Sequence, residues 1–178
     1  MRAAIIATTF LVMGGLLLGC GAAARGPASI DELRRMVEER PDDVRARAQL
    51  GIGEYLANEG DPAQAQELLS DALEGEVSLP GASLMLALID HFQGRPTPAL
   101  SRLMQVLDDC ATTPQADCAP VTEVASAALS ELADITPGFN ERVNAALPPL
   151  LGDGGSNLGA ATRFQIGMVL MTSALRAG

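Results

Sequence analysis

Two stretches of this 178-residue sequence share one pattern of small and apolar residues at an offset of 34 positions. Gly60 and Gly94 are related by this offset, and each separates two helix-like segments. The other matched pairs are Ile52 and Leu86, Gly53 and Ala87, Ala65 and Ala99, Leu69 and Leu103, Ala72 and Val106, and Leu73 and Leu107. A fixed period of this length is typical of proteins built from stacked supersecondary units. The period therefore predicts two helix-turn-helix units in one register.

Helix-start signals and apolar spacing predict an all-α fold for the chain after the first 28 residues. Ser29 stands at an N-cap position and is followed by acidic residues in the first turn of a helix over 29–40. Asp42 and Asp43 are expected to start the next helix. The further helices are expected at 44–58, 62–74, 82–92, 97–109, 119–135, 139–147 and 158–175. The intervening sequence 152–157, GDGGSN, is expected to be a flexible link in which Ser156 or Asn157 caps the last helix.

The last expected helix, 158–175, is apolar on nearly every side. Arg163 and Gln165 are its strongly polar side chains. A helix of this composition is expected to be buried on more than one side, whereas a terminal repeat normally has a polar outer face. Three explanations for this apolar helix stay open. The helix packs centrally, or it contacts a partner, which can be a second copy of the chain, or the chain is a piece of a longer repeat protein.

The segment from Gly60 to Leu73 resembles the second half of a tetratricopeptide repeat (TPR), and Ile52-Gly53 with Leu56 resembles the first half. Small residues such as Gly53 and Ala65 allow two helices to approach closely. The resemblance implies antiparallel helix-turn-helix repeats, a TPR-like α-solenoid, over 29–109. The remaining residues, 110–178, would form a C-terminal helical extension. A generic bundle of helical hairpins is the alternative.

The sequence departs from the TPR pattern at positions where the family usually has large aromatic residues. The residues found there are Gln49 and Ser83, Leu56 and Asp90, and Leu69 and Leu103. A buried Asp90 would be unfavourable without a partner. The second unit is therefore expected to be rotated or partly open.

The first twenty residues have the pattern of a secretory signal peptide. Arg2 precedes an apolar stretch from Ala3 to Leu18, which is shorter than the roughly 20 residues that a spanning helix needs. A retained transmembrane anchor and a plain secretion signal are the alternatives. The end of the segment, Leu17-Leu18-Gly19-Cys20, resembles the lipobox of bacterial lipoproteins. This resemblance implies removal of residues 1–19, lipidation of Cys20 and a lipidated tether over 20–28.

The same resemblance implies a location in the cell envelope. Gly21 follows the cysteine, and in diderm bacteria this suggests export to the outer membrane, facing the periplasm. Loss of Arg2 with the signal leaves 11 Arg against 22 acidic residues, a charge of −11. Because anionic headgroups repel such a domain, the lipid is expected to be its only attachment to the membrane.

Composition excludes several function classes. A charge of −10 and a pI near 4.4 disfavour nucleic acid as a partner, and 3% aromatic residues leave little for bases to stack on. The motifs G-x-S-x-G, H-E-x-x-H and the P-loop are absent from the sequence. His91 is the single histidine and is expected at a surface or interface. The GDGGSN loop has one carboxylate, Asp153, and lacks the alternating oxygen ligands of a calcium loop. We therefore expect no enzyme, no metal and no cofactor.

Cys110 and Cys118 bracket a short loop that contains Pro114. An exported compartment oxidises thiols, so this pair predicts a disulfide bond. Free thiols are the alternative, and a metal or redox site is disfavoured because the CxxC spacing is absent.

The resemblance to TPR proteins also implies a concave groove lined by the first helix of each unit. The residues expected to face a partner by this register are Arg47, Leu50, Glu54, Asn58, Leu84, Leu88, His91 and Phe92. The set lacks the Lys and Asn residues of carboxylate-clamp members, so an extended or helical peptide with apolar anchors is the expected ligand. The alternative is that these side chains, Leu84 and Leu88 above all, pack against a neighbouring helix.

These observations together predict a lipid-anchored, non-catalytic envelope protein whose helical repeats bind or scaffold other proteins or peptides. The alternative is that the chain is the N-terminal docking or regulatory part of a longer, possibly enzymatic, envelope repeat protein.

Overall fold

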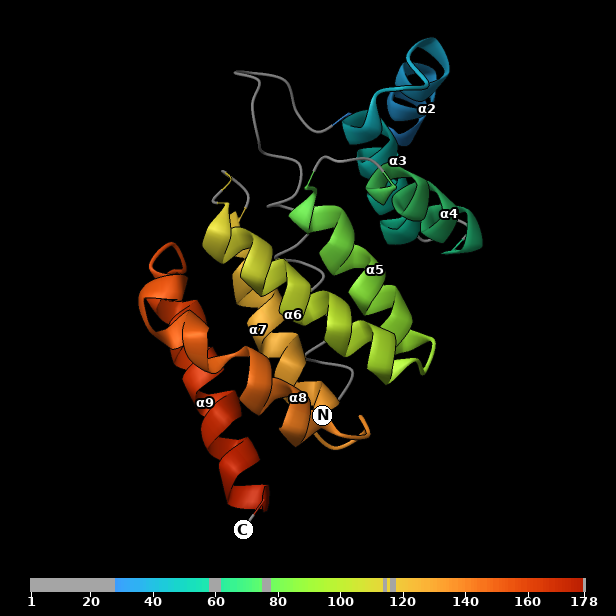
Figure 1. Ribbon diagram of the computed structural model, residues 1–178. Helices are drawn as coiled ribbons and strands as arrows, with labels where there is room; N and C mark the ends of the chain where they lie inside the picture. The colour runs from blue at the N-terminus through green and yellow to red at the C-terminus, as the bar shows by residue number, and fades with distance from the viewer. Residues whose placement is uncertain (1–27, 58–61, 75–77, 114, 116–117, 178) are drawn as a thin grey trace. The chain divides into compact units, whose positions relative to one another are not determined.

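The computed structural model describes residues 28–57, 62–74, 78–113, 115 and 118–177, and this part of the chain is helical without strands. The prediction of an all-α fold is confirmed. The elements are α2 (Ile30–Glu39), α3 (Val44–Leu56), α4 (Pro62–Leu73), α5 (Pro80–Phe92), α6 (Pro96–Thr112), α7 (Cys118–Leu132), α8 (Phe139–Ala146), the 3-10 turns η1 (Pro148–Leu151) and η2 (Asp153–Gly155), and α9 (Ala160–Ala177) (Figure 1). The expected signal peptide, Cys20 and all of the tether but its last residue lie outside the described residues.

The chain divides into two compact units, Met1–Ala82 and Ser83–Gly178. The described helices of the first unit are α2, α3 and α4. The second unit joins the hairpin of α5 and α6 with the helices that we expected as a C-terminal extension.

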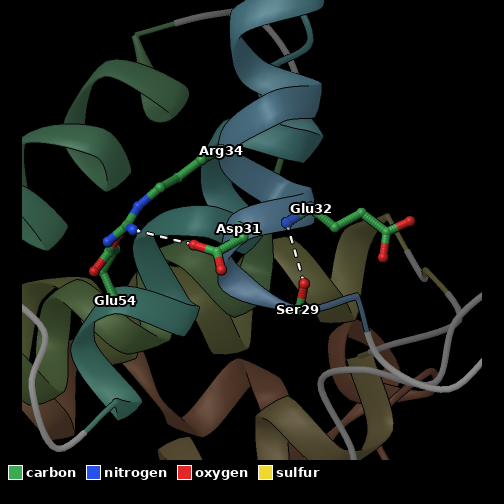
Figure 2. Close-up of polar contacts among 5 residues, drawn as sticks. All are labelled: Ser29, Asp31, Glu32, Arg34 and Glu54. Carbon is green, nitrogen blue, oxygen red and sulfur yellow. Dashed lines mark hydrogen bonds and ion pairs between the residues drawn. The ribbon is translucent and has the colours of Figure 1, made fainter.

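Local capping explains where the helices of the first unit begin. The Ser29 hydroxyl accepts a hydrogen bond from the Glu32 amide at 3.2 Å (Figure 2). The Asp43 carboxylate accepts one from the Ala46 amide at 3.0 Å. Each cap satisfies an amide that has no partner within its helix. Both helix starts agree with the sequence analysis.

Helices α3 and α4 pack closely because Gly51 has no side chain. A Cβ atom added to Gly51 would lie 2.8 Å from Cγ of Leu69, closer than packed carbon atoms come. The sequence analysis assigned this role to Gly53, but a Cβ atom there would make an ordinary contact with Ile30, at 3.6 Å from its Cγ1. The close approach therefore occurs two residues earlier than expected.

Three of the four pairs related by the 34-residue offset share their burial in the second helix of each hairpin, whereas Leu73 is partly exposed and its counterpart Leu107 is buried. The pairs Ala65 and Ala99, Leu69 and Leu103, and Ala72 and Val106 are all buried. In the first helices the agreement is weaker, because Leu86 and Ala87 are buried whereas Ile52 and Gly53 are partly exposed. The period thus marks equivalent core positions of α4 and α6.

Two glycines in left-handed backbone conformations set the turns of the second unit. Gly94 has φ of 72° between α5 and α6, and Gly138 has φ of 67° at the start of α8. Residues with a Cβ atom rarely adopt this conformation. The core of this unit contains, among others, Leu84, Leu100, Leu103, Leu107, Leu129, Leu132, Leu147 and Ile166.

A disulfide bond joins Cys110, near the end of α6, to Cys118 at the start of α7, with their Cα atoms 5.5 Å apart. This is the pairing that the sequence predicted. It holds the ends of two successive helices together at the point where the repeat pattern stops.

The segment before α9 is more ordered than the sequence suggested. It contains η1 and η2, and a Cβ atom on the buried Gly155 would lie only 1.7 Å from the carbonyl oxygen of Leu150. The expected capping role of Ser156 or Asn157 is wrong, because α9 begins after Gly159, whose carbonyl accepts from the Arg163 amide at 3.0 Å. The Asn157 side chain instead donates to the carbonyl of Ala111 at 2.6 Å and fixes this segment to α6.

Candidate functional site

Four of the eight residues expected to line a groove on α3 and α5 are not available to a ligand. Leu50, Glu54, Leu84 and Leu88 are buried. These four side chains offer no exposed surface to a ligand, and the burial of Leu84 and Leu88 agrees with the packing alternative. Asn58 lies outside the described residues.

Arg47, another expected groove residue, has a local structural contact. Its guanidinium donates a hydrogen bond to the carbonyl oxygen of Pro41, in the turn before its own helix. The side chain therefore helps to hold the connection between α2 and α3.

The buried Glu54 has an ion-pair partner within its own unit. Its Oε1 atom lies 2.7 Å from Nη2 of Arg34 on α2, and Arg34 also lies 3.4 Å from the carboxylate of Asp31 (Figure 2). Pairing offsets the cost of removing a carboxylate from water. Glu54 thus joins α3 to α2.

Asp90 is buried, and two arginines compensate its charge. Its carboxylate oxygens lie 2.7 Å from Arg95 and 3.1 Å from Arg102. Arg102 is on α6, so the pair connects the two helices of the hairpin. The unfavourable burial of Asp90 is offset because the acid is paired with two arginines, and a rotated or partly open second unit stays a prediction.

His91 and Phe92 lie at the end of α5 and are more exposed than the rest of the expected groove. His91 Nε2 lies 3.5 Å from Oε2 of Glu131 on α7, and the rings of His91 and Phe92 are 5.4 Å apart. Phe92 is 45% exposed. In the described part of the chain, no group of three or more His, Cys, Asp or Glu residues could hold a metal ion.

Four of the six exposed large apolar side chains in the described part of the chain form a row along α9. We call it the α9 stripe, and it consists of Phe164, Met168, Met171 and Leu175, which are 66%, 40%, 52% and 78% exposed. Steps of four, three and four residues place all of them on one face of a helix. The stripe runs along most of the 18-residue helix that is drawn in red in Figure 1.

The opposite face of α9 is buried, although it is the more polar of the two. It consists of Thr162, Ile166, Val169 and Ser173. The hydroxyl of Thr162 lies 3.2 Å from that of Thr122 on α7, within hydrogen-bond distance. A surface helix normally has its apolar residues on the buried face. In α9 this polarity is reversed, since the four residues of the stripe, including Phe164 and Leu175, face outward.

The α9 residues that directly flank the stripe are uncharged. Small residues flank it at Ala160, Gly167 and Ala174, and a Cβ atom added to Gly167 would have no neighbour within 4 Å. The two charged residues of the helix are held by their own chain. Arg163 donates to the carbonyl of Leu151 at 2.7 Å, and Arg176 lies 2.8 Å from the carboxylate of Asp134.

The sequence of this helix is apolar on nearly every side, but the residues expected to bind a partner lie on other helices. The regular spacing from Phe164 to Leu175 was the signal that could have identified the stripe. The buried face has the same spacing, so the sequence alone left open which of the two faces is exposed.

No protein-family model matches the sequence, and searches of curated proteins and of solved structures gave no match. Among the described helices, none has the length and apolarity needed to cross a membrane.

Proposed function

We propose that this chain is a non-catalytic, lipid-anchored protein of the bacterial cell envelope that binds another protein through the α9 stripe. The observation that carries the proposal is the exposure of four large apolar side chains in one uncharged row. Contiguous exposed apolar surface of this kind marks interaction sites in soluble domains.

The geometry of the stripe favours a helical partner. Residues spaced by four, three and four positions form the contact row of paired helices, and the row is about 16 Å long at 1.5 Å per residue. Full burial of a Leu, Phe or Met side chain contributes about 1.5 to 3 kcal/mol. Four partly exposed side chains therefore provide several kcal/mol toward association, before the entropic cost of binding.

In this proposal the two hairpins are TPR-like units that act as a scaffold. Support comes from the 34-residue offset and from the burial that α4 and α6 share at the related positions. Since the side chains expected to line a groove are largely buried, the contact with a partner is assigned to α9 instead.

The proposed location is the outer membrane, with Cys20 as the lipidated residue and the helical domain in the periplasm. The support is the lipobox-like sequence ending at Cys20, together with the Cys110–Cys118 disulfide, because disulfides persist in oxidising compartments.

Site-specific photo-cross-linking of the full chain in cells tests the proposal. A photoreactive residue at position 168 should give a discrete cross-linked product with a protein, and Met171→Glu should abolish it. The matched control is the same residue at position 145, which is exposed on α8 but outside the stripe. If positions 164, 168 and 171 all give no product, the stripe is not a binding surface.

A further inference from the structure

We propose that the partner of the α9 stripe is the same stripe of a second copy of this chain, paired antiparallel about a two-fold axis. This inference rests on the proposed function and names the partner of that surface. Three features of α9 support it: the order of its side chains, the residues that flank the stripe, and its charge.

The spacing of the stripe reads the same in both directions. Under a two-fold axis perpendicular to the helix, Phe164 faces Leu175 of the second copy and Met168 faces Met171 of the second copy. All four side chains of each copy then meet an apolar partner, with none left over. A two-fold interface requires such self-complementarity, because one patch must serve as both halves of the contact.

The flanking positions are also self-complementary in this register. On one side, Gly167 lies beside Ala174 of the second copy, and both residues are small enough to let the helices approach closely. On the other side, Gln165 lies beside Thr172 of the second copy, so that one polar uncharged residue meets another. Charged residues at flanking positions usually set partner choice in paired helices. Because the flanking positions of α9 carry no charged residue, they do not select for a partner of opposite charge.

Charge does not oppose the contact at the interface itself. The whole chain has a formal charge of −10, but α9 contains no Asp or Glu. Arg163 and Arg176 are held by Leu151 and Asp134 of their own chain and lie off the stripe. The acidic residues of two copies therefore repel one another mainly across solvent, where salt screens charges beyond about 8 Å.

Cysteine cross-linking of the full chain in its membrane tests the antiparallel register. Phe164→Cys and Leu175→Cys chains are co-expressed with different tags and treated with a short thiol cross-linker. We expect a dimer that carries both tags, because these positions face one another. Two copies of position 164 would lie about 16 Å apart along the helix axis, so the Phe164→Cys chain alone should give little product. Strong self-cross-linking of each single variant, without the mixed product, would overturn the antiparallel pairing.

The mass of the full chain in mild detergent, measured by sedimentation, tests the second copy itself. We expect a mass of two chains for the wild type and at least tenfold weaker association for Met168→Glu. Ala127→Glu, which adds the same charge to an exposed position of α7, should remain dimeric. The circular dichroism spectrum of Met168→Glu should match that of the wild type, since the side chain is exposed in the single chain.

Met168→Glu could weaken association for a reason other than the proposed register, so a pair of opposite charges at facing positions provides a second test. Met168→Glu chains mixed with Met171→Lys chains should form a heterodimer more tightly than either variant alone, because the two new charges face each other. Absence of this rescue overturns the proposed register. A wild-type chain that is monomeric, yet cross-links from position 168 to a different protein, overturns the second copy and leaves the proposed function standing. If the wild type is monomeric and position 168 cross-links to no protein, the second copy and the proposed function are both overturned.

Discussion

Glu54 on α3 accepts two hydrogen bonds from the guanidinium of Arg34 on α2, at 2.9 Å from Nε and 2.7 Å from Nη2. The Glu54 side chain is 3% exposed, whereas that of Arg34 is 51% exposed. The carboxylate therefore depends on one arginine for its compensation, while the arginine still reaches water. Charge-assisted bonds of this kind are stronger than neutral ones. The pair thus adds an ion-pair contact to the packing of α2 on α3, in which Leu33 is also buried.

Arg34→Ala should lower the free energy of unfolding by about 1 to 3 kcal/mol, because it leaves the buried Glu54 carboxylate without its partner. Chemical denaturation measures the loss. The matched control is Arg35→Ala on the same helix, whose pair with Glu39 at 4.0 Å is exposed and should contribute less than about 1 kcal/mol. Equal losses in the two variants would contradict a structural role for the buried pair.

Asp90→Ala should destabilise the hairpin of α5 and α6 by about 1 to 3 kcal/mol. The substitution removes the shared partner of Arg95 and Arg102, both of which are partly exposed and can regain water. Asp134→Ala is the control, because its pair with Arg176 is largely exposed on the carboxylate side. Hydrogen exchange of α5 and α6 amides should show the loss locally. Unchanged protection in Asp90→Ala would contradict the pairing.

The sequence predicted the helices well because its local signals do not depend on tertiary contacts. Ser29 and Asp43 cap helices by reaching amides three positions ahead, and Gly94 turns the chain through its own backbone freedom. The Cys110–Cys118 bond followed from short spacing and the expected compartment. Each of these features depends on residues that lie within about ten positions of one another in the sequence.

The candidate site could not be predicted in the same way, because exposure depends on distant residues. Burial of Asp90 was expected to be unfavourable, but two arginines, five and twelve positions later, compensate its charge. The two faces of α9 have the same spacing, and packing against α7 decides that Thr162 faces inward and Phe164 outward. A rule that buries the more apolar face would have chosen wrongly.

Reduction of the Cys110–Cys118 disulfide should lower the free energy of unfolding by about 2 to 3 kcal/mol, the loop-closure entropy for a sequence separation of 8 residues. The denaturation midpoint of the wild type should fall when reductant is added. A chain with Cys110→Ser and Cys118→Ser should start at the lower midpoint and not respond to reductant. A response of equal size in this double variant would show that reductant acts elsewhere.

Asp109→Asn should stabilise the protein at neutral pH by less than about 1 kcal/mol, because the group is only partly buried and solvent screens its charge. Burial, and then the neighbouring charge of Asp108, raise the pKa of Asp109 above its ordinary value of 3.8. The folded state therefore holds this proton to higher pH than the unfolded state. Its contribution to stability is present below the unfolded pKa and is lost as pH rises through the folded pKa.

The gain from Asp109→Asn should therefore disappear below about pH 3.8, where the carboxyl is protonated in both states. Denaturation of the variant and the wild type at several pH values measures this difference. Asp71→Asn, on an exposed position of α4, is the matched control for the substitution itself. A gain for Asp109→Asn that stays constant down to pH 3 would contradict a titrating origin.

Cys20→Ser should abolish incorporation of a labelled fatty acid and leave the precursor uncleaved, because the thiol is the proposed attachment point for the lipid. Labelling in cells followed by gel analysis measures both effects. Cys118→Ser is the matched control and should remain labelled, since Cys118 is bonded to Cys110 in the folded domain. A single acyl chain holds a protein to a bilayer only marginally, so stable fractionation with membranes also requires the complete lipid modification. Continued labelling of Cys20→Ser would remove the lipid anchor from the proposed function, while the α9 stripe would remain as a separate proposal.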